Sequence, residues 1–239
     1  MLSPAPEINS LPPFALVLSL EYRPEDAGQV LQLGQQLAAS HAEHPRGYRF
    51  AAYTEDAGPV QKIHVLAPLQ SPHETEERRN VLADTQAQEA LANLYEHLKN
   101  SESFIATYIP ELSNPFTGGQ SGPVPYVYLI SAMIKPGLTE EARASAREAG
   151  RKIVAAHQQS VKGRNFVTYH SYSGTDDVFH VAVLFAGLGE LDEWVENHEL
   201  LREAYGAEEA ARLLDAVGRV SVKYVGRVAK YHPFISNIT

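Results

Sequence analysis

The sequence has 239 residues, of which 44% are hydrophobic and 21% charged, with a formal net charge of −9 and no cysteine. This length suits one or two domains with an apolar core, and the acidic balance without a basic stripe argues against a nucleic-acid partner. The missing cysteines exclude disulfides, thiolate nucleophiles and cysteine-ligated metal sites.

The chain begins with residues 1–13, which contain prolines but neither a basic segment nor an apolar one, so they do not read as a secretory signal. No run of about eighteen apolar residues follows, so no membrane span is predicted and we expect a cytoplasmic protein. Apolar runs, helical spacing and turn residues then predict five elements. They are a strand at 15–22, a helix ending at His41, a hairpin of 48–53 with 62–69, a helical region at 74–98 and a strand at 103–109.

Residues 110–125 contain four prolines and three glycines, which predicts a linker without a regular element. After it the same succession of patterns returns. The predicted elements are a strand at 126–134, a helix capped by Thr139, a hairpin of 165–172 with 178–185, a helical region at 191–217 broken near Gly206, and a strand at 221–230.

The two parts also match residue by residue. Ser19 and Ser131 occupy the same place in the two apolar runs that open them. At a single offset of 116, five residues of the first part meet identical residues of the second. They are His41, Gly47, Phe50, Tyr53 and His64, which fall on His157, Gly163, Phe166, Tyr169 and His180. The sequence therefore predicts an internal duplication, with repeats at 14–109 and 126–235.

Each repeat reads βαββαβ, the order of a ferredoxin-like unit in the α+β class. Such a sheet carries its helices on one face, so the bare face needs a partner. We expect the two sheets to pack face to face within one chain. In this arrangement the chain resembles the dimeric α/β-barrel superfamily, here as a fused tandem repeat.

One local stretch carries a narrower resemblance. Residues 191–205, with Trp194, are similar to a helix segment of the antibiotic-biosynthesis monooxygenase group. That resemblance implies oxygenation or proton transfer without a cofactor, on an aromatic or apolar molecule. Relatives that degrade haem carry a histidine about ten residues after the tryptophan, where this chain has Ala204 and Tyr205. This difference argues against transferring haem ligation to the chain.

The duplicated Tyr and His of each hairpin are the candidate catalytic residues. Counting back from the turn places Tyr169 opposite His180 and Tyr53 opposite His64, which brings each phenol within reach of an imidazole. A neutral imidazole can take a proton from a phenol or enol, and the tyrosine can orient it. The alternative is that both histidines are structural and bond within the core.

Three further residues are candidates for substrate binding. Ser19 and Ser131 lie within apolar strands and either meet a ligand or bond a nearby backbone group. Trp194, the single tryptophan, either contacts substrate or anchors the core. No metal site is predicted, because the stretch after His73 lacks the second histidine of a zinc motif, and no glycine-rich phosphate loop follows a strand.

Three hypotheses for the function stay open at this stage, and whether the protein is an enzyme is among the open points. The first is a small-molecule-binding barrel, monooxygenase-like and cofactor-independent, that takes an aromatic or apolar molecule in the lumen or between sheet and helices. The second is a haem protein of the chlorite-dismutase-like type. The third is a non-catalytic stress or ligand-sensing protein, which predicts a barrel interior filled by side chains, with no pocket of about 300 Å³ or more. The chain is compatible with a monomer or a homo-oligomer.

Overall fold

The structure is a computed structural model that describes residues 11–43, 49–55, 60–81, 85–115, 123–173, 176–193 and 196–238. Its strands are β1 (Phe14–Tyr22), β2 (Ala51–Glu55), β3 (Gln61–Leu69), β4 (Leu98–Tyr108), β5 (Tyr126–Ile134), β6 (Phe166–Ser173), β7 (Asp176–Phe185) and β8 (Ser221–Tyr231). Its helices are α1 (Ala27–Glu43), α2 (Glu74–Val81), α3 (Thr85–Glu96), α4 (Glu140–Gln159), α5 (Asn197–Tyr205) and α6 (Ala207–Val220).

The strands form one closed antiparallel barrel in the order β1-β3-β2-β8-β5-β7-β6-β4. The sequence predicted a barrel built from two sheets, and in the structure these sheets also join at their edges. One seam pairs β2 with β8 through Tyr53 and Tyr231, and the other pairs β4 with β6 through Tyr108 and Tyr169. Edge strands carry unpaired N–H and C=O groups, and closing the barrel satisfies these groups.

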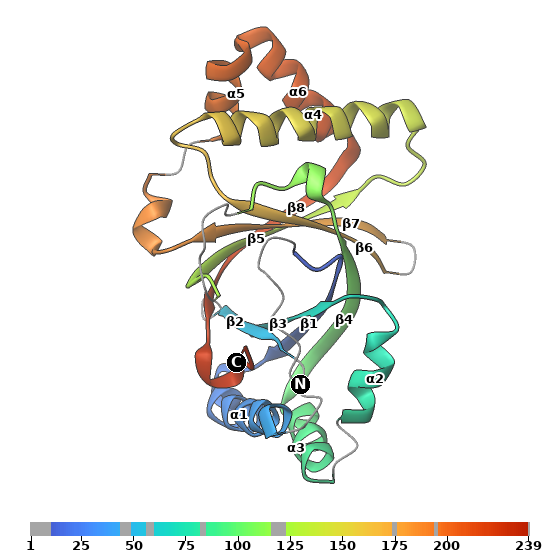
Figure 1. The fold of residues 1–239 in the computed structure, drawn as a ribbon, viewed down its shortest axis with the longest axis vertical. Helices are drawn as coiled ribbons and strands as arrows, with labels where there is room; N and C mark the ends of the chain where they lie inside the picture. The colour runs from blue at the N-terminus through green and yellow to red at the C-terminus, as the bar shows by residue number, and fades with distance from the viewer. Residues whose placement is uncertain are drawn as a thin grey trace, which may run out of the picture.

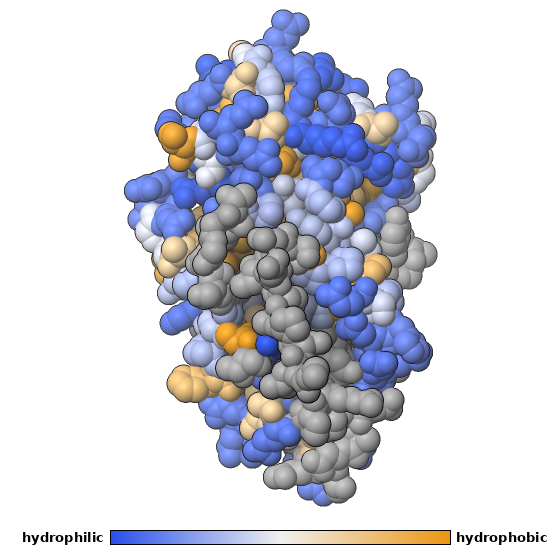
Figure 2. All heavy atoms as spheres, in the orientation of Figure 1, coloured by the Kyte–Doolittle hydropathy of each residue, from blue (hydrophilic) through white to orange (hydrophobic). Residues whose placement is uncertain are grey.

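Helices cover the outside of the barrel at two opposite ends (Figure 1). α1, α2 and α3 lie at the end that holds the first four strands, and α4, α5 and α6 lie at the other. In the same orientation the visible helix surfaces are mainly hydrophilic (Figure 2). The apolar sides of the helices are buried in separate clusters, with Val30 and Leu33 in the first, Leu201 in a second and Val154 in a third.

Alternation along β7 assigns its two faces. Val183 and Phe185 pack with Val154 of α4, so their side chains face the helices. His180 bonds Ser131 across the neighbouring strand and faces the barrel interior. Successive side chains of a strand point to opposite sides, so these residues of β7 face two different spaces.

Each of the two long helical regions predicted from the sequence contains two helices. Residues 74–98 form α2 and α3, and Leu98 already opens β4, which starts five residues earlier than the strand predicted at 103–109. Residues 191–217 hold α5 and α6, which meet at Gly206 as predicted. Gly206 has a φ of 85°, a backbone conformation that side chains with a Cβ rarely adopt.

The region predicted as an unstructured linker begins with an ordered segment. Pro110–Leu112 is a 3₁₀ turn that lies against α4, so close that a Cβ at Gly150 would stand 2.7 Å from Leu112 Cδ2. The 3₁₀ turn Pro233–Ile235 follows β8 in the same way and reaches the other half of the barrel. There Ile235 contacts Gly34 of α1 and is buried in the first cluster. We call residues 110–114 and 233–237 the two crossing segments. Proline at the first position suits such a turn, since it lacks an N–H to satisfy.

The same kinds of hydrogen bond hold each crossing segment against the other half of the barrel. Asn114 bridges to Phe166 at the start of β6, and Asn237 bridges to Phe50 just before β2. Ser236 Oγ accepts a hydrogen bond from the Ala52 N–H, and Ser113 Oγ accepts one from the Thr168 N–H. Each half of the barrel is therefore completed by a segment that belongs to the other half.

Truncating the second crossing segment tests this architecture. Ile235→Ala removes a side chain that is 4% exposed, and we expect it to cost about 2–5 kcal/mol of unfolding free energy. The matched control Ile238→Ala changes a residue that is 39% exposed and should stay within about 0.5 kcal/mol of the original. Urea unfolding measures both, and equal small effects would show that the segment is not docked.

Candidate functional site

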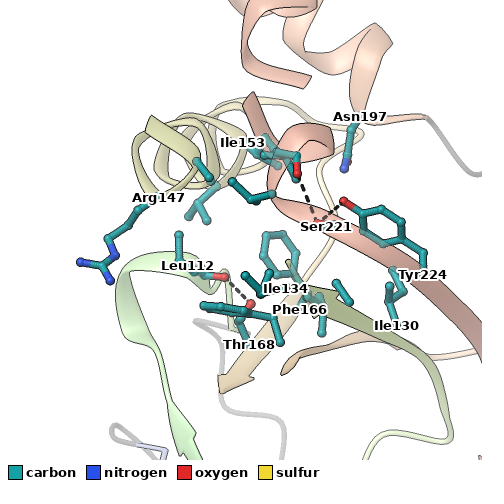
Figure 3. Close-up of a pocket in the computed structure, with 18 of the residues that line it drawn as sticks. Leu112, Ile130, Ile134, Arg147, Ile153, Phe166, Thr168, Asn197, Ser221 and Tyr224 are labelled. Carbon is teal, nitrogen blue, oxygen red and sulfur yellow. Dashed lines mark hydrogen bonds between the residues drawn. The ribbon is translucent and has the colours of Figure 1, made fainter. Parts of the chain in front are cut away.

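Two cavities lie on opposite sides of the same strands. The larger, here called the helix-side pocket, has a volume of 320 Å³ and separates α4 from the outer face of the second half's strands (Figure 3). The smaller, here called the lumen cavity, has a volume of 230 Å³ and is lined by strands of both halves. The lumen cavity is smaller than the volume of about 300 Å³ that the hypothesis of a non-catalytic protein sets as the limit for the barrel interior, whereas the helix-side pocket exceeds this volume.

The wall of the helix-side pocket is mostly aliphatic and aromatic. Ile153 of α4 faces Phe166 and Ile134 across the space, and Leu112 of the crossing segment closes one side (Figure 3). Two hydroxyl groups of the wall already donate hydrogen bonds within the protein. Thr168 donates to the Leu112 carbonyl, and Tyr224 donates to Ser221 Oγ over 2.7 Å. The pocket therefore suits a largely apolar molecule.

His157 fixes one polar donor at the rim of this pocket. Its Nδ1 accepts a hydrogen bond from the Arg164 backbone N–H at 2.9 Å, so in the neutral ring the proton is on Nε2. Nε2 then donates to Asn197 Oδ1 over 3.0 Å, and Asn197, an exposed residue, is one of the polar residues that line the pocket. Burial lowers the pKa of His157 and the charge of Arg164 lowers it further, although the bond with Asn197 acts the other way.

A glycine makes this arrangement possible. A Cβ at Gly163 would stand 1.7 Å from the His157 carbonyl oxygen, so only glycine allows the chain to turn back this closely after α4. The tight turn brings the next N–H, that of Arg164, onto the imidazole. His157 is therefore a structural residue that positions Asn197.

The helix-side pocket does not fit haem with a histidine ligand. His157 is the single histidine among its described lining residues, and both of its ring nitrogens are engaged. An axial ligand needs a free ring nitrogen. Nor do three metal-ligating side chains gather anywhere in the described ranges.

In the lumen cavity, His64 connects a serine to a carboxylate. Its Nδ1 is 2.9 Å from Ser19 Oγ, and its Nε2 is 2.5 Å from Glu55 Oε1. The other oxygen of Glu55 accepts from Arg227 of β8 at 3.0 Å, across the seam between the halves. Burial alone would raise the pKa of Glu55, but the hydrogen bonds that it accepts from His64 and Arg227 hold it below its usual range.

His180 occupies the corresponding place in the second half but has neutral partners. Its Nδ1 is 3.0 Å from Ser131 Oγ, its Nε2 is 2.9 Å from Ser171 Oγ, and its ring stacks on Phe104 at 4.8 Å. Burial lowers the pKa of His180 to about 4, with a contribution from His170. This imidazole is therefore uncharged at neutral pH and is a weak base.

The predicted register of both hairpins is confirmed, but the predicted contact within each pair is not. Tyr53 lies opposite His64 and Tyr169 opposite His180, yet in the described structure the serines, not the tyrosines, bond the rings. The tyrosine rings pack at the seams instead, on Tyr231 and Tyr108. Burial and this neighbouring phenol raise the pKa of each tyrosine to about 12, so both stay protonated.

The remaining predicted residues divide between the cavities and the undescribed part of the chain. Ser19 and Ser131 line the lumen cavity with the two histidines, whereas Trp194 lies outside the described residues. None of these residues lines the helix-side pocket. Asn197 was missed, although it lies within the stretch 191–205 that carries the resemblance to monooxygenases.

Comparisons with known proteins support the fold. No family model and no curated protein matches the sequence. A proposed monooxygenase from Fusobacterium nucleatum has a TM-score of 0.59 at 10% identity, over 92% of this chain and 93% of that one. An anthrone oxidase-like protein has a TM-score of 0.56 at 12% identity, over 92% of each chain.

A chlorite dismutase variant from Candidatus Nitrospira defluvii has a TM-score of 0.54 at 13% identity, over 94% of this chain and 93% of that one. This chain has the fold of these proteins. At such low identity the likeness extends to the fold alone. Among the described residues, moreover, no helix is both long enough and apolar enough to cross a membrane.

The neutral state of His180 can be measured directly. Its imidazole C–H resonances, identified by their loss in His180→Gln, should stay constant from about pH 8 to about pH 5. Between about pH 6.5 and 4 the unfolded ring binds a proton that the folded ring does not. The stability of the original chain should therefore fall relative to His180→Gln as the pH is lowered through this window. A resonance midpoint near 6.5 would contradict the assignment.

Proposed function

We propose that this protein binds a flat, mainly apolar molecule with one carbonyl or hydroxyl oxygen in the helix-side pocket and oxidises it with dioxygen without a bound cofactor. The observation that carries the proposal is an apolar space of 320 Å³ with the oriented Asn197 amide at its rim. A cavity of about 150 Å³ accommodates benzene, so this one has room for a larger ring system.

The residues of the pocket supply binding and charge stabilisation in this proposal. Ile153, Phe166 and Leu112 exclude water from the rings. When a carbon acid such as an aromatic ketone loses a proton, negative charge collects on its oxygen. The Asn197 amide N–H groups donate to that oxygen, and a preformed donor of this kind lowers the energy of the charged state.

Anthrone represents this substrate class, and the name of one structural neighbour supports the choice. Its oxidation is balanced without a further reductant, because anthrone and one dioxygen give anthraquinone and one water. The ketone gives a proton from carbon to solvent, the resulting anion forms a C–O bond with dioxygen, and the peroxide takes up a proton. Loss of water from this hydroperoxide then forms the second carbonyl. A haem-dependent reaction finds no support in the pocket, since His157 has no free nitrogen to offer.

We also infer that the chain is a tandem repeat of two ferredoxin-like units. The strand orders β4-β1-β3-β2 and β8-β5-β7-β6 are the same in the two halves. The 3₁₀ turns that follow β4 and β8 cross in the same way, and a tyrosine pair marks each seam. An internal twofold arrangement accounts for all of these matches together.

Removing the oriented amide tests the proposed chemistry. Asn197→Ala should lower kcat/KM for aerobic anthrone oxidation by roughly tenfold or more, because the charged oxygen loses its donor. Oxygen uptake and quinone absorbance, corrected for the spontaneous reaction, provide the measurement. Asn93→Ala, the same change at an exposed position of α3, should leave the rate unchanged. No uptake above background with the original chain would reject the proposed oxidation.

Filling the space tests where the molecule binds. Ala146→Phe places a ring into the helix-side pocket from α4, and we expect it to abolish anthrone binding while the thermal midpoint is kept. Fluorescence titration of the original chain and the variant measures the two affinities. If Ala146→Phe is folded and binds anthrone as the original chain does, the pocket is not the site.

A further inference from the structure

The two halves of the lumen cavity use matching register positions for different chemistry. Ser19 and Ser131 bond the Nδ1 atoms of the two histidines. Glu55 then stands where the second half has Ser171, because each is two residues beyond the tyrosine opposite the histidine. Each group of serine, histidine and Glu55 or Ser171 has a fourth member, which comes from the strand across the seam. In the first group Arg227 bonds Glu55, and in the second Phe104 stacks on His180.

The hydrogen bonds around His64 assign the proton positions of its neutral ring. The ionised Glu55 carboxylate can only accept, so Nε2 of His64 carries a proton and donates it to Oε1. In the neutral ring Nδ1 is then the acceptor, and it takes the hydroxyl proton of Ser19. Ser19 Oγ is thereby the point at which a ligand in the cavity meets a base with a carboxylate behind it.

The opposite end of the cavity is uncharged. His180 has both ring nitrogens bonded to serine hydroxyls, and Phe104 stacks on its ring with an angle of 16° between the planes. Leu66, Leu129 and Ala182 continue this apolar wall. The lumen cavity therefore pairs one basic end with one aromatic and aliphatic end.

Charge decides which ligand suits this space. Glu55 and Glu102 both line the cavity, and its two cations are already paired, Arg227 with Glu55 and Lys62 with Glu21. An anion would therefore enter against two carboxylates. A neutral weak acid avoids that repulsion and becomes charged only after it has given a proton to His64, whose positive charge Glu55 then balances.

We propose that the lumen cavity is a second ligand site, which takes a single-ring phenol and deprotonates it through Ser19 and His64. The phenol O–H donates its proton to Ser19 Oγ, while the Ser19 hydroxyl proton moves to His64 Nδ1. The products are a bound phenolate and an imidazolium that is hydrogen-bonded to Glu55. A volume of 230 Å³ suits one ring, since about 150 Å³ is enough for benzene.

The probe for this site is 4-nitrophenol, because its phenolate absorbs visible light and its phenol does not. At a pH where the free probe is mostly protonated, binding to the full chain should produce the phenolate absorbance. His64→Gln should remove this absorbance or weaken binding roughly tenfold or more. The matched control His73→Gln changes a histidine whose side chain is 74% exposed and should behave as the original chain.

Ser19→Ala provides a milder change if His64→Gln does not fold. It removes one hydroxyl and should reduce the phenolate fraction of the bound probe, whereas an unchanged fraction would overturn the relay. NMR locates the probe. The resonances of His64 and His180 should shift on binding, and a shift confined to His157 would place the probe in the helix-side pocket and overturn the proposal. Absence of phenolate absorbance with the original chain would overturn it as well.

Discussion

Closure of the barrel is the constraint on which the other features depend. Each four-stranded sheet has one face under its helices and one bare face, and it has two edges with unpaired backbone groups. The seams between β2 and β8 and between β4 and β6 pair these edges over only a few residues. In return the bare faces enclose a lumen into which side chains of both halves project, so His64 of one half meets Arg227 of the other through Glu55.

The enclosed lumen requires that its polar groups find partners within the protein. Each of its histidines bonds two side chains, and each tyrosine at a seam packs on a second tyrosine. On the helix side of the same strands aliphatic side chains dominate, and the polar side chains Thr168 and Tyr224 of the wall bond neighbouring groups of the protein. Ile130 and Val181 line both cavities, so a single layer of strands separates the basic space from the apolar one.

The sequence predicted the features that depend on periodicity. Strand order along the chain and the hairpin registers follow from alternation and from turn residues, and both agree with the structure. The crossing segments were not predicted, because proline-rich composition does not show where a segment docks. The partners of His64 were missed for a similar reason. Glu55 lies two residues after Tyr53 on the same face, and Arg227 comes from a strand that only the closed barrel brings near.

The exchange of 3₁₀ turns between the halves has a consequence for variation. If two identical chains formed such a barrel, every substitution would appear twice, and a carboxylate beside one histidine would also stand beside the other. A single polypeptide removes this restriction while the docking of Leu112 and Ile235 keeps the halves together. Glu55 can then face Arg227 on one side while Ser171 and Phe104 surround His180 on the other, which gives a nearly symmetric scaffold a polarised interior.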